Sequence, residues 1–192
     1  AGRHYKAGLE VFLVDPLPKT YAQTDKPVDV IQVRFKITDF RDPDADRPSV
    51  NLIGHKKAAF GLVVADVYTY RPPADIVRST ITSQLQARGH RLVDREDDII
   101  VTGKIEEFSV TTSINLSSWD VICSLDVSLS INSSRDPHDV LVRRYQVQNI
   151  SKTFFGPSRE DFEQVMVRCL EDLQKQVDSD DETAQMFHRQ RQ

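Results

Sequence analysis

The densest cluster of side chains that could do chemistry is an acidic run in the first quarter of the chain. Asp42, Asp44 and Asp46 alternate as the oxygen ligands do at the start of a calcium-binding EF-hand loop. The likeness ends there, because Arg47 stands where that loop needs glycine and Ile53 stands where it needs a bidentate glutamate. The run therefore predicts a solvated acidic turn, with a weak cation or small-ligand site as the alternative.

A small-ligand site at this turn would combine it with the Ile-Gly pair that follows along the chain. The residues assigned to it are Asp39, Arg41, Asp42, Asp44 and Gly54. No metal or other cofactor is assigned to the chain.

A second group of carboxylates falls on the predicted sheet. Asp120 and Asp126 share the polar face of one strand, and Glu106 and Glu107 lie on the strand before it. General acid-base catalysis needs one carboxyl group with a raised pKa in a closed pocket. An open face surrounded by serine offers no such burial, so these residues do not predict an active site.

Motif searches and the remaining reactive residues point away from an enzyme. The chain has no nucleophile elbow, zinc-protease helix, dinucleotide loop or phosphate loop. The five histidines are scattered without metal-ligand spacing. Cys123 and Cys169 each fall on the apolar side of a predicted element, which favours two buried thiols and leaves a disulfide between strand and helix as the alternative.

An aromatic pair marks the end of the last predicted strand. Phe154 and Phe155 are adjacent and are followed by Gly156-Pro157. Because neighbouring residues in a strand face opposite sides, at least one ring should point away from the core. It either anchors a partner or covers the start of the next helix.

Long strands carry most of the regular pattern. Residues 119–131 alternate apolar and mostly polar side chains, which predicts one apolar face and one polar face. Strands are predicted at 99–110, 118–132 and 140–154, and they are joined by short turns that favour an antiparallel meander. Earlier and shorter strands are predicted at 28–39, 58–70 and 91–93.

Two amphipathic helices accompany these strands. The first covers residues 75–88 and ends at Gly89, and the second covers 158–177, with Ser158 as N-cap and Asp161 as its capping partner. The predicted class is α+β, a two-layer α/β sandwich in which two helices cover one face of a mixed, mostly antiparallel sheet.

Domain organisation follows from length and composition. The 192 residues, 39% hydrophobic and 28% charged, suit one globular domain at 28–180. Residues 1–27 are an N-terminal extension or an added edge strand, and 181–192 a polar tail that adds a final helical turn or stays mobile. The net charge of −4 disfavours a nucleic-acid partner.

Several short motifs together resemble the YajG-like lipoproteins of Gram-negative bacteria. In that family a strand closes on an Asp-x-Arg motif, here Asp39 and Arg41, and an Ile-Gly pair follows, here Ile53 and Gly54. A helix with spaced aliphatic residues then ends at glycine. The matching positions are Ile76, Ile81, Leu85 and Gly89, and the likeness spans about residues 28–181.

The resemblance implies a periplasmic protein held at the outer membrane by a lipidated cysteine, which this chain lacks near Ala1. It brings no catalytic residues. The leading hypothesis is a non-catalytic envelope module that binds a protein partner or assembles with itself, through the polar sheet face, a free sheet edge or the Phe154-Phe155 corner. The alternative is a small-ligand or cation-binding module that uses residues 39–46.

Overall fold

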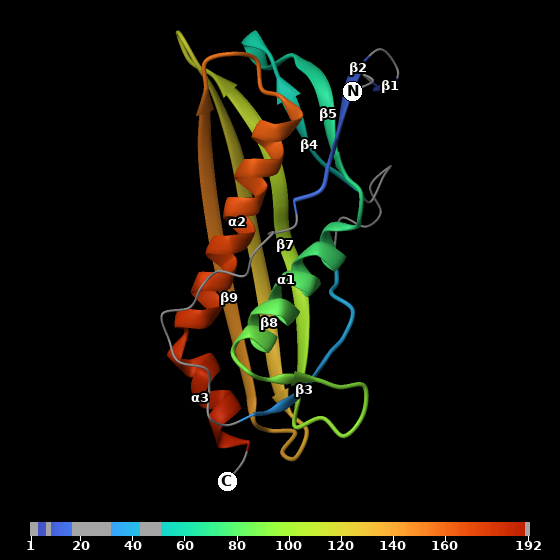
Figure 1. Cartoon of the computed structure of the whole chain (residues 1–192), viewed down its shortest axis with the longest axis vertical. Helices are drawn as coiled ribbons and strands as arrows, with labels where there is room; N and C mark the ends of the chain where they lie inside the picture. The colour runs from blue at the N-terminus through green and yellow to red at the C-terminus, as the bar shows by residue number, and fades with distance from the viewer. Residues whose placement is uncertain (1–3, 7–8, 17–31, 43–50, 191–192) are drawn as a thin grey trace.

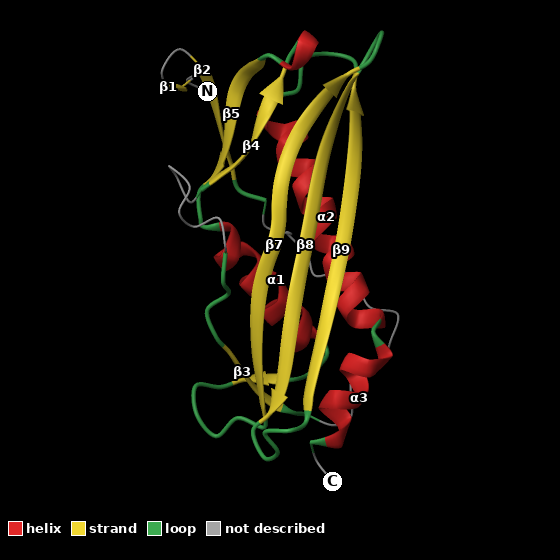
Figure 2. Cartoon of the chain, turned by 180° about the vertical axis from the view of Figure 1, so that it is seen from behind, coloured by secondary structure: helices red, strands yellow, loops and turns green. Residues whose placement is uncertain are grey.

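The computed structural model describes residues 4–6, 9–16, 32–42 and 51–190, and these form one mixed sheet with helices on one of its faces (Figures 1 and 2). The strands are β1 His4–Lys6, β2 Leu9–Val14, β3 Arg34–Ile37, β4 Leu52–Lys57, β5 Val63–Thr69, β6 Arg91–Leu92, β7 Ile99–Ile114, β8 Trp119–Ser133 and β9 Val140–Thr153. The helices are α1 Pro73–Ala87, α2 Arg159–Ser179 and α3 Asp181–Arg189.

The three long strands β7, β8 and β9 form the predicted antiparallel meander. β7 is long enough to have two different neighbours on its other side. β3 runs parallel to its first residues, and β4 runs parallel to it near Val110 and Thr111. The sheet continues from β4 through β5 and β2 to β1 at the far edge. This arrangement confirms the predicted fold class.

Alternating side chains in β8 separate the two faces of the sheet. The odd-numbered residues from Val121 to Ile131 are buried beneath the helices, while most even-numbered ones are half-buried on the opposite, open face. A β-bulge between Ile105 and Glu107 shifts the alternation in β7, so that even-numbered residues line its open face before the bulge and odd-numbered ones after it.

Local signals explain where the helices begin and how they pack. α1 begins at Pro73, because proline suits the first helical turn. The capping box predicted before α2 is present, with Ser158 accepting from the Asp161 N–H and Asp161 accepting from the Ser158 N–H. Phe162 and Leu170 of α2 are fully buried against the sheet.

Three sequence predictions need correction. The strand predicted at 58–70 is wrong at its start: residues 52–57 are strand β4, a turn with a 3-10 segment at Ala59–Gly61 follows, and β5 begins at Val63. Residues 181–189 form helix α3 with buried Met186 and Phe187, which is longer than the final helical turn given as one alternative for this polar tail. The apolar face is therefore covered by three helices in the described chain, one more than predicted.

Candidate functional site

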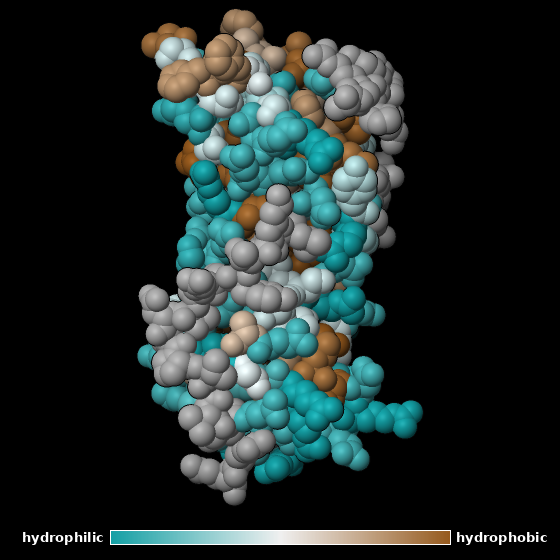
Figure 3. Space-filling view, in the orientation of Figure 1, coloured by the Kyte–Doolittle hydropathy of each residue, from teal (hydrophilic) through white to brown (hydrophobic). Residues whose placement is uncertain are grey.

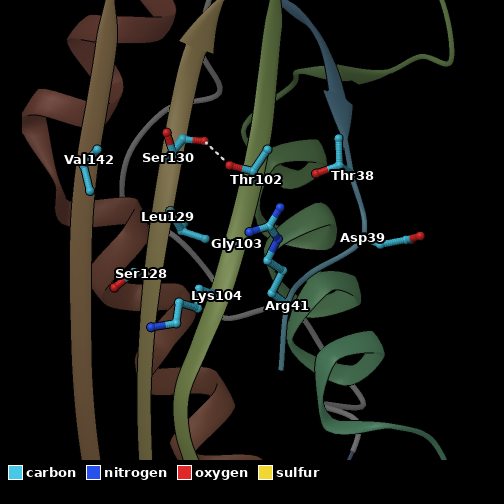
Figure 4. Close-up of a pocket in the computed structure, with 10 residues that line it drawn as sticks. All are labelled: Thr38, Asp39, Arg41, Thr102, Gly103, Lys104, Ser128, Leu129, Ser130 and Val142. Atoms are coloured by element: carbon cyan, nitrogen blue, oxygen red, sulfur yellow. Dashed lines mark hydrogen bonds between the residues drawn. The ribbon is translucent and has the colours of Figure 1, made fainter. Parts of the chain in front are cut away.

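The open face of the sheet carries a groove of about 680 Å³ between the segment after β3 and strand β9 (Figure 4). This volume lies within the usual range of ligand pockets, but the groove is broad and open to solvent. The residues that line it are Thr38, Asp39, Arg41, Thr102, Gly103, Lys104, Ser128, Leu129, Ser130 and Val142.

Backbone pairing with β7 holds Arg41 at the rim of this groove. The Arg41 N–H donates to the Gly103 carbonyl at 3.0 Å, and the Ile105 N–H donates to the Arg41 carbonyl at 2.8 Å. Buried Phe40 packs against Gly103, where an added Cβ would lie only 2.5 Å from the ring. Figure 4 shows the Arg41 side chain turned toward β7 and the Asp39 carboxylate turned away. Asp39 accepts a hydrogen bond from Arg78 at 2.8 Å.

Ion pairs neutralise two of the carboxylates of the open face. Arg144 forms a two-pronged pair with Asp126, at 2.8 and 2.6 Å, and Gln146 donates to the same carboxylate at 2.8 Å. The hydrogen bond from Arg144 lowers the pKa of Asp126. Glu106 accepts from Lys104 at 2.7 Å, which also lowers its pKa. Both carboxyl groups therefore stay ionised near neutral pH and are poorly suited to donate a proton.

The acidic turn is described only as far as Asp42. That residue is half-buried, and Asp44 and Asp46 lie outside the described residues. Within the described part of the chain, no cluster of three or more histidine, cysteine or acidic side chains has the geometry of a metal site. Participation of Asp42 and Asp44 in binding stays a prediction.

Gly54 is separated from this turn by its place in the sheet. It lies inside β4, where an added Cβ would be 1.7 Å from the Val110 carbonyl oxygen of β7. The close approach of two backbones explains the glycine without a ligand. A second shallow hollow, of about 370 Å³, adjoins Gly54 on β4 and β7.

Phe154 and Phe155 are both solvent-exposed at the end of β9, so neither ring covers the start of α2. Their side chains are 72% and 84% exposed. The Thr153 hydroxyl donates to the Phe155 carbonyl at 3.2 Å and fixes the turn between them. They lie in the connection from β9 to α2, at one end of the molecule (Figure 1).

Sequence reasoning did not assign the groove residues contributed by β7, β8 and β9. Lys104, Ser128 and Val142 come together only because the three strands pair in a fixed register, with Lys104 opposite Ser128 and Val142 opposite Ser130. The alternation in β8 was visible in the sequence. The register that places residues of β7 and β9 opposite those of β8 was not.

None of the described helices has the length and apolar character needed to cross a membrane. No curated protein sequence matches the chain.

One solved structure shows the same fold, and others are similar to this chain over most of their length. Protein XCC0632 from Xanthomonas campestris aligns over 88% of this chain and 98% of its own, with 12% sequence identity and a TM-score of 0.59. A minor lipoprotein from Acinetobacter baumannii aligns over 84% and 95%, with 10% identity and a TM-score of 0.44. The rare lipoprotein B from Shewanella oneidensis aligns over 78% and 98%, with 8% identity and a TM-score of 0.40.

The match to a family is more direct, because it is made on sequence. A family described as an uncharacterized lipoprotein matches residues 52–188, from the start of β4 to the last turn of α3. This stretch includes the whole meander, α1 and α2. The chain therefore belongs to this family of uncharacterized lipoproteins.

Proposed function

We propose that this chain is a non-catalytic binding module of the cell envelope, of the YajG-like type, and that a protein partner adds a strand to the edge of β9. One observation carries the proposal: β9 pairs along its 14 residues with β8 and with no other described strand. An edge of this length presents a row of backbone donors and acceptors to a partner strand.

The direction of these backbone groups follows from one hydrogen bond. The Ser133 N–H donates to the Asp139 carbonyl at 3.0 Å, just before β9 begins. Pairs in an antiparallel ladder alternate between bonded and non-bonded, so the odd-numbered residues of β9 bond to β8 and the even-numbered ones point outward. The Gln176 side chain donates to the outward carbonyl of Gln146 at 3.0 Å, which agrees with this direction.

Side chains along the edge also suit a partner. Val140, Val142 and Ile150 are each roughly half exposed or more on the open face, toward the two ends of the strand. In the middle, Arg144 is neutralised by Asp126. Charged side chains on a natural sheet edge usually discourage another strand from pairing with it. The ion pair between Arg144 and Asp126 weakens this effect here. A bound strand would cover apolar side chains that the chain leaves in water.

The electrostatics of the open face support a binding role over a catalytic one. Asp126 and Glu106 both have lowered pKa values because cations hydrogen-bond to them. A carboxylate held ionised by a paired cation is a poor general acid, because general acid catalysis needs a carboxyl that stays protonated.

Proline substitutions in β9 test whether a partner strand pairs with this edge. Gln148→Pro removes an outward N–H, so β8 pairing should survive while strand addition is blocked. Gln148→Ala shortens the same side chain and keeps the N–H, which makes it the matched control. Ser151→Pro removes an N–H that bonds to β8 and should instead destabilise the fold by about 3 kcal/mol.

The measurement is covalent crosslinking to a partner, through a photo-crosslinking residue placed at position 150 in living Gram-negative cells. We expect one main protein adduct that Gln148→Pro abolishes and Gln148→Ala preserves. An adduct between two copies of this chain would place self-assembly at the same edge. An adduct that persists in Gln148→Pro would rule out strand addition.

The cellular location is part of this proposal and is tested separately. A periplasm-facing protein tethered to the outer membrane should carry a lipidated cysteine at the mature N-terminus of its full-length form. Mass spectrometry of that N-terminus, together with fractionation of the two membranes, measures both. An unmodified cytosolic start would remove the envelope location and leave the edge to be judged by crosslinking.

The groove favours a second candidate, a small anionic ligand held between Arg41 and Lys104. Both cationic side chains line the groove, with the hydroxyls of Thr102 and Ser128 beside them. Arg41→Ala together with Lys104→Ala should abolish binding of such a ligand and leave the β9 crosslink intact. Loss of the crosslink in this double variant would show that the partner also occupies the groove.

A further inference from the structure

We propose that one end of this molecule inserts into the headgroup region of a lipid bilayer that carries anionic lipids. This end, called the apolar tip here, consists of residues 57–62, 113–118 and 152–157, which connect β4 to β5, β7 to β8 and β9 to α2. The inference does not depend on the partner proposed for β9, although the last residues of β9, Lys152 and Thr153, belong to both surfaces.

Exposed apolar side chains are concentrated at this tip. Figures 1 and 2 show the three connections together at one end of the sheet, and Figure 3 shows apolar atoms gathered over them. The five most exposed large apolar side chains of the described residues all belong to it: Leu116 at 109%, Phe60 at 107%, Phe155 at 84%, Phe154 at 72% and Leu62 at 66%. Large apolar side chains gathered at one exposed end of a protein mark an interaction site.

The backbone at Phe60 indicates that this exposure is built into the turn. Phe60 adopts φ 59° and ψ 20°, in the left-handed region that bulky residues rarely occupy, and Gly61 follows at φ 74°. The turn is closed by the Ala58 N–H donating to the Leu62 carbonyl at 2.7 Å. A strained residue whose ring touches nothing inside the fold contributes to a surface and not to the core.

Hydrogen bonds between the three connecting segments hold the tip in one shape. Thr112 of β7 bonds to the Lys57 backbone twice, accepting from its N–H at 2.7 Å and donating to its carbonyl at 3.0 Å. The Lys56 ammonium donates to the Pro157 carbonyl at 2.9 Å and lies 5.7 Å from the centre of the Trp119 ring. A preorganised apolar surface loses little conformational entropy when it binds.

Charge selects a membrane as the occupant. The three tip segments contain Lys57 and Lys152 and no acidic residue, and Asp120 of β8 lies beside them, opposite Ser113 and Lys152. At the opposite end, residues 93–98 and 134–139 contain six acidic residues against two arginines, and Arg34 and Arg189 pair with three of these carboxylates. A chain with an acidic end and a basic, apolar end is oriented by an anionic bilayer so that the apolar tip faces the lipid. Aromatic and leucine side chains flanked by lysine are the composition of interfacial membrane anchors.

The position of the N-terminal strands is consistent with this orientation. β1 and β2 lie toward the tip end, and α3 lies at the other end (Figure 1). A lipid attached upstream of β1, as the family description implies for a lipoprotein, would hold the tip near the bilayer.

Vesicle co-sedimentation of the chain without any lipid modification tests the inference. The probes are vesicles of phosphatidylcholine alone and vesicles with about 30% phosphatidylglycerol. We expect binding to the anionic vesicles that weakens as salt is raised. Substituting Leu116→Ser, Phe154→Ser and Phe155→Ser together should weaken it by about tenfold or more. Leu92→Ser, an exposed apolar residue at the other end, is the matched control.

Lysine reversal separates charge from apolar insertion. Lys57→Glu with Lys152→Glu should reduce binding to anionic vesicles and leave any weak binding to neutral vesicles unchanged. Equal binding by wild type and triple variant, or no binding by wild type, overturns the proposal. A dimer of the wild type that the triple variant loses, without vesicle binding, would assign the tip to a second copy of this chain. Circular dichroism confirms that each variant is folded.

Discussion

Phe60 is a residue whose conformation is unfavourable for folding and whose side chain is free to act outside the fold. An L-residue in the left-handed region costs about 1 kcal/mol or more, and asparagine tolerates that region better than phenylalanine. Since the ring is fully exposed, its removal sacrifices no buried contact. We therefore expect Phe60→Asn to raise the free energy of unfolding by about 0.5–1 kcal/mol.

Chemical denaturation measures this gain, with Leu62→Ser as a control at a neighbouring exposed position of ordinary φ. The same Phe60→Asn protein should bind anionic vesicles less well. A variant that is less stable than the wild type would mean that the Phe60 ring supports the fold.

Gly54 shows the opposite case, a residue required by packing. An alanine Cβ there would overlap the Val110 carbonyl oxygen, and backbone cannot move aside cheaply. Gly54→Ala should destabilise the protein by about 3 kcal/mol by separating β4 from β7. At Gly156 an added Cβ would meet only Lys56 Nζ, at an ordinary 3.6 Å, so Gly156→Ala should stay within about 0.5 kcal/mol of wild type. Thermal melts of the two variants distinguish these outcomes.

At the scale of elements, Asp180 connects α2, α3 and the sheet. It accepts from the Glu182 and Thr183 N–H groups as N-cap of α3, and from the side chains of Arg143 at 2.7 Å and Tyr145 at 2.9 Å. Burial alone would raise the pKa of Asp180, but the hydrogen bonds from Tyr145 and Arg143 outweigh it and lower the pKa.

This lowered pKa makes part of the stability depend on pH. A carboxylate whose pKa is lower in the folded state stabilises the fold above its unfolded pKa of about 3.9, and the contribution is lost as pH falls through the folded value. We expect Asp180→Ala to cost about 1–2 kcal/mol at neutral pH and clearly less near pH 3. Asp181→Ala, on the same turn but not the N-cap, is the control. A cost that is equal at both pH values would contradict the assigned ionisation.

Packing of α2 on β8 places the two cysteines in contact. Both are fully buried and free, and the Cys169 thiol donates to the Cys123 carbonyl at 3.3 Å. The interaction with Cys169, reinforced by burial, raises the pKa of Cys123 well above its ordinary value. Because both thiols are fully buried, native protein should react with a thiol reagent such as Ellman's reagent at neither cysteine, while denatured protein should react at both. Rapid labelling without denaturant would show that this layer opens readily.

The elements that sequence could reveal are those whose signal is local. β8 carries its own alternation, and α2 carries its own capping box at Ser158. β4 does not: Leu52–Lys57 holds a glycine and two lysines and becomes a strand only through its pairing with β5 and β7. For the same reason, the exposure of Phe154 and Phe155 could be predicted from the sequence. The exposure of Phe60 could not, because it lies within an apolar run that resembles a strand.

At the scale of the whole molecule, three paired strands of similar length bring distant turns together. Because β7, β8 and β9 alternate in direction, the β7–β8 hairpin and the end of β9 must lie at one end of the sheet, and the parallel pairing of β4 with β7 brings the β4–β5 turn to the same end. The β8–β9 turn and α3 lie at the other end (Figure 1). With the tip on a bilayer, the edge of β9 would stand away from the membrane along its length, open to a partner strand.

This geometry predicts that the point of attachment decides whether the tip reaches the lipid. A histidine tag at the N-terminus, held on nickel-chelating vesicles, leaves the tip close to the bilayer, whereas a tag after α3 holds the acidic end there.

Trp119 is the single tryptophan and directly follows the tip segment 113–118, so its fluorescence reports on the tip alone. Brominated lipids should quench Trp119 in the N-terminally held chain and leave it largely unquenched in the C-terminally held one. The serine triple variant, held by its N-terminus, is the control that should lose most of this quenching. Equal quenching from both ends would mean that the tip does not set the orientation, and the apolar side chains would then have to serve a protein partner.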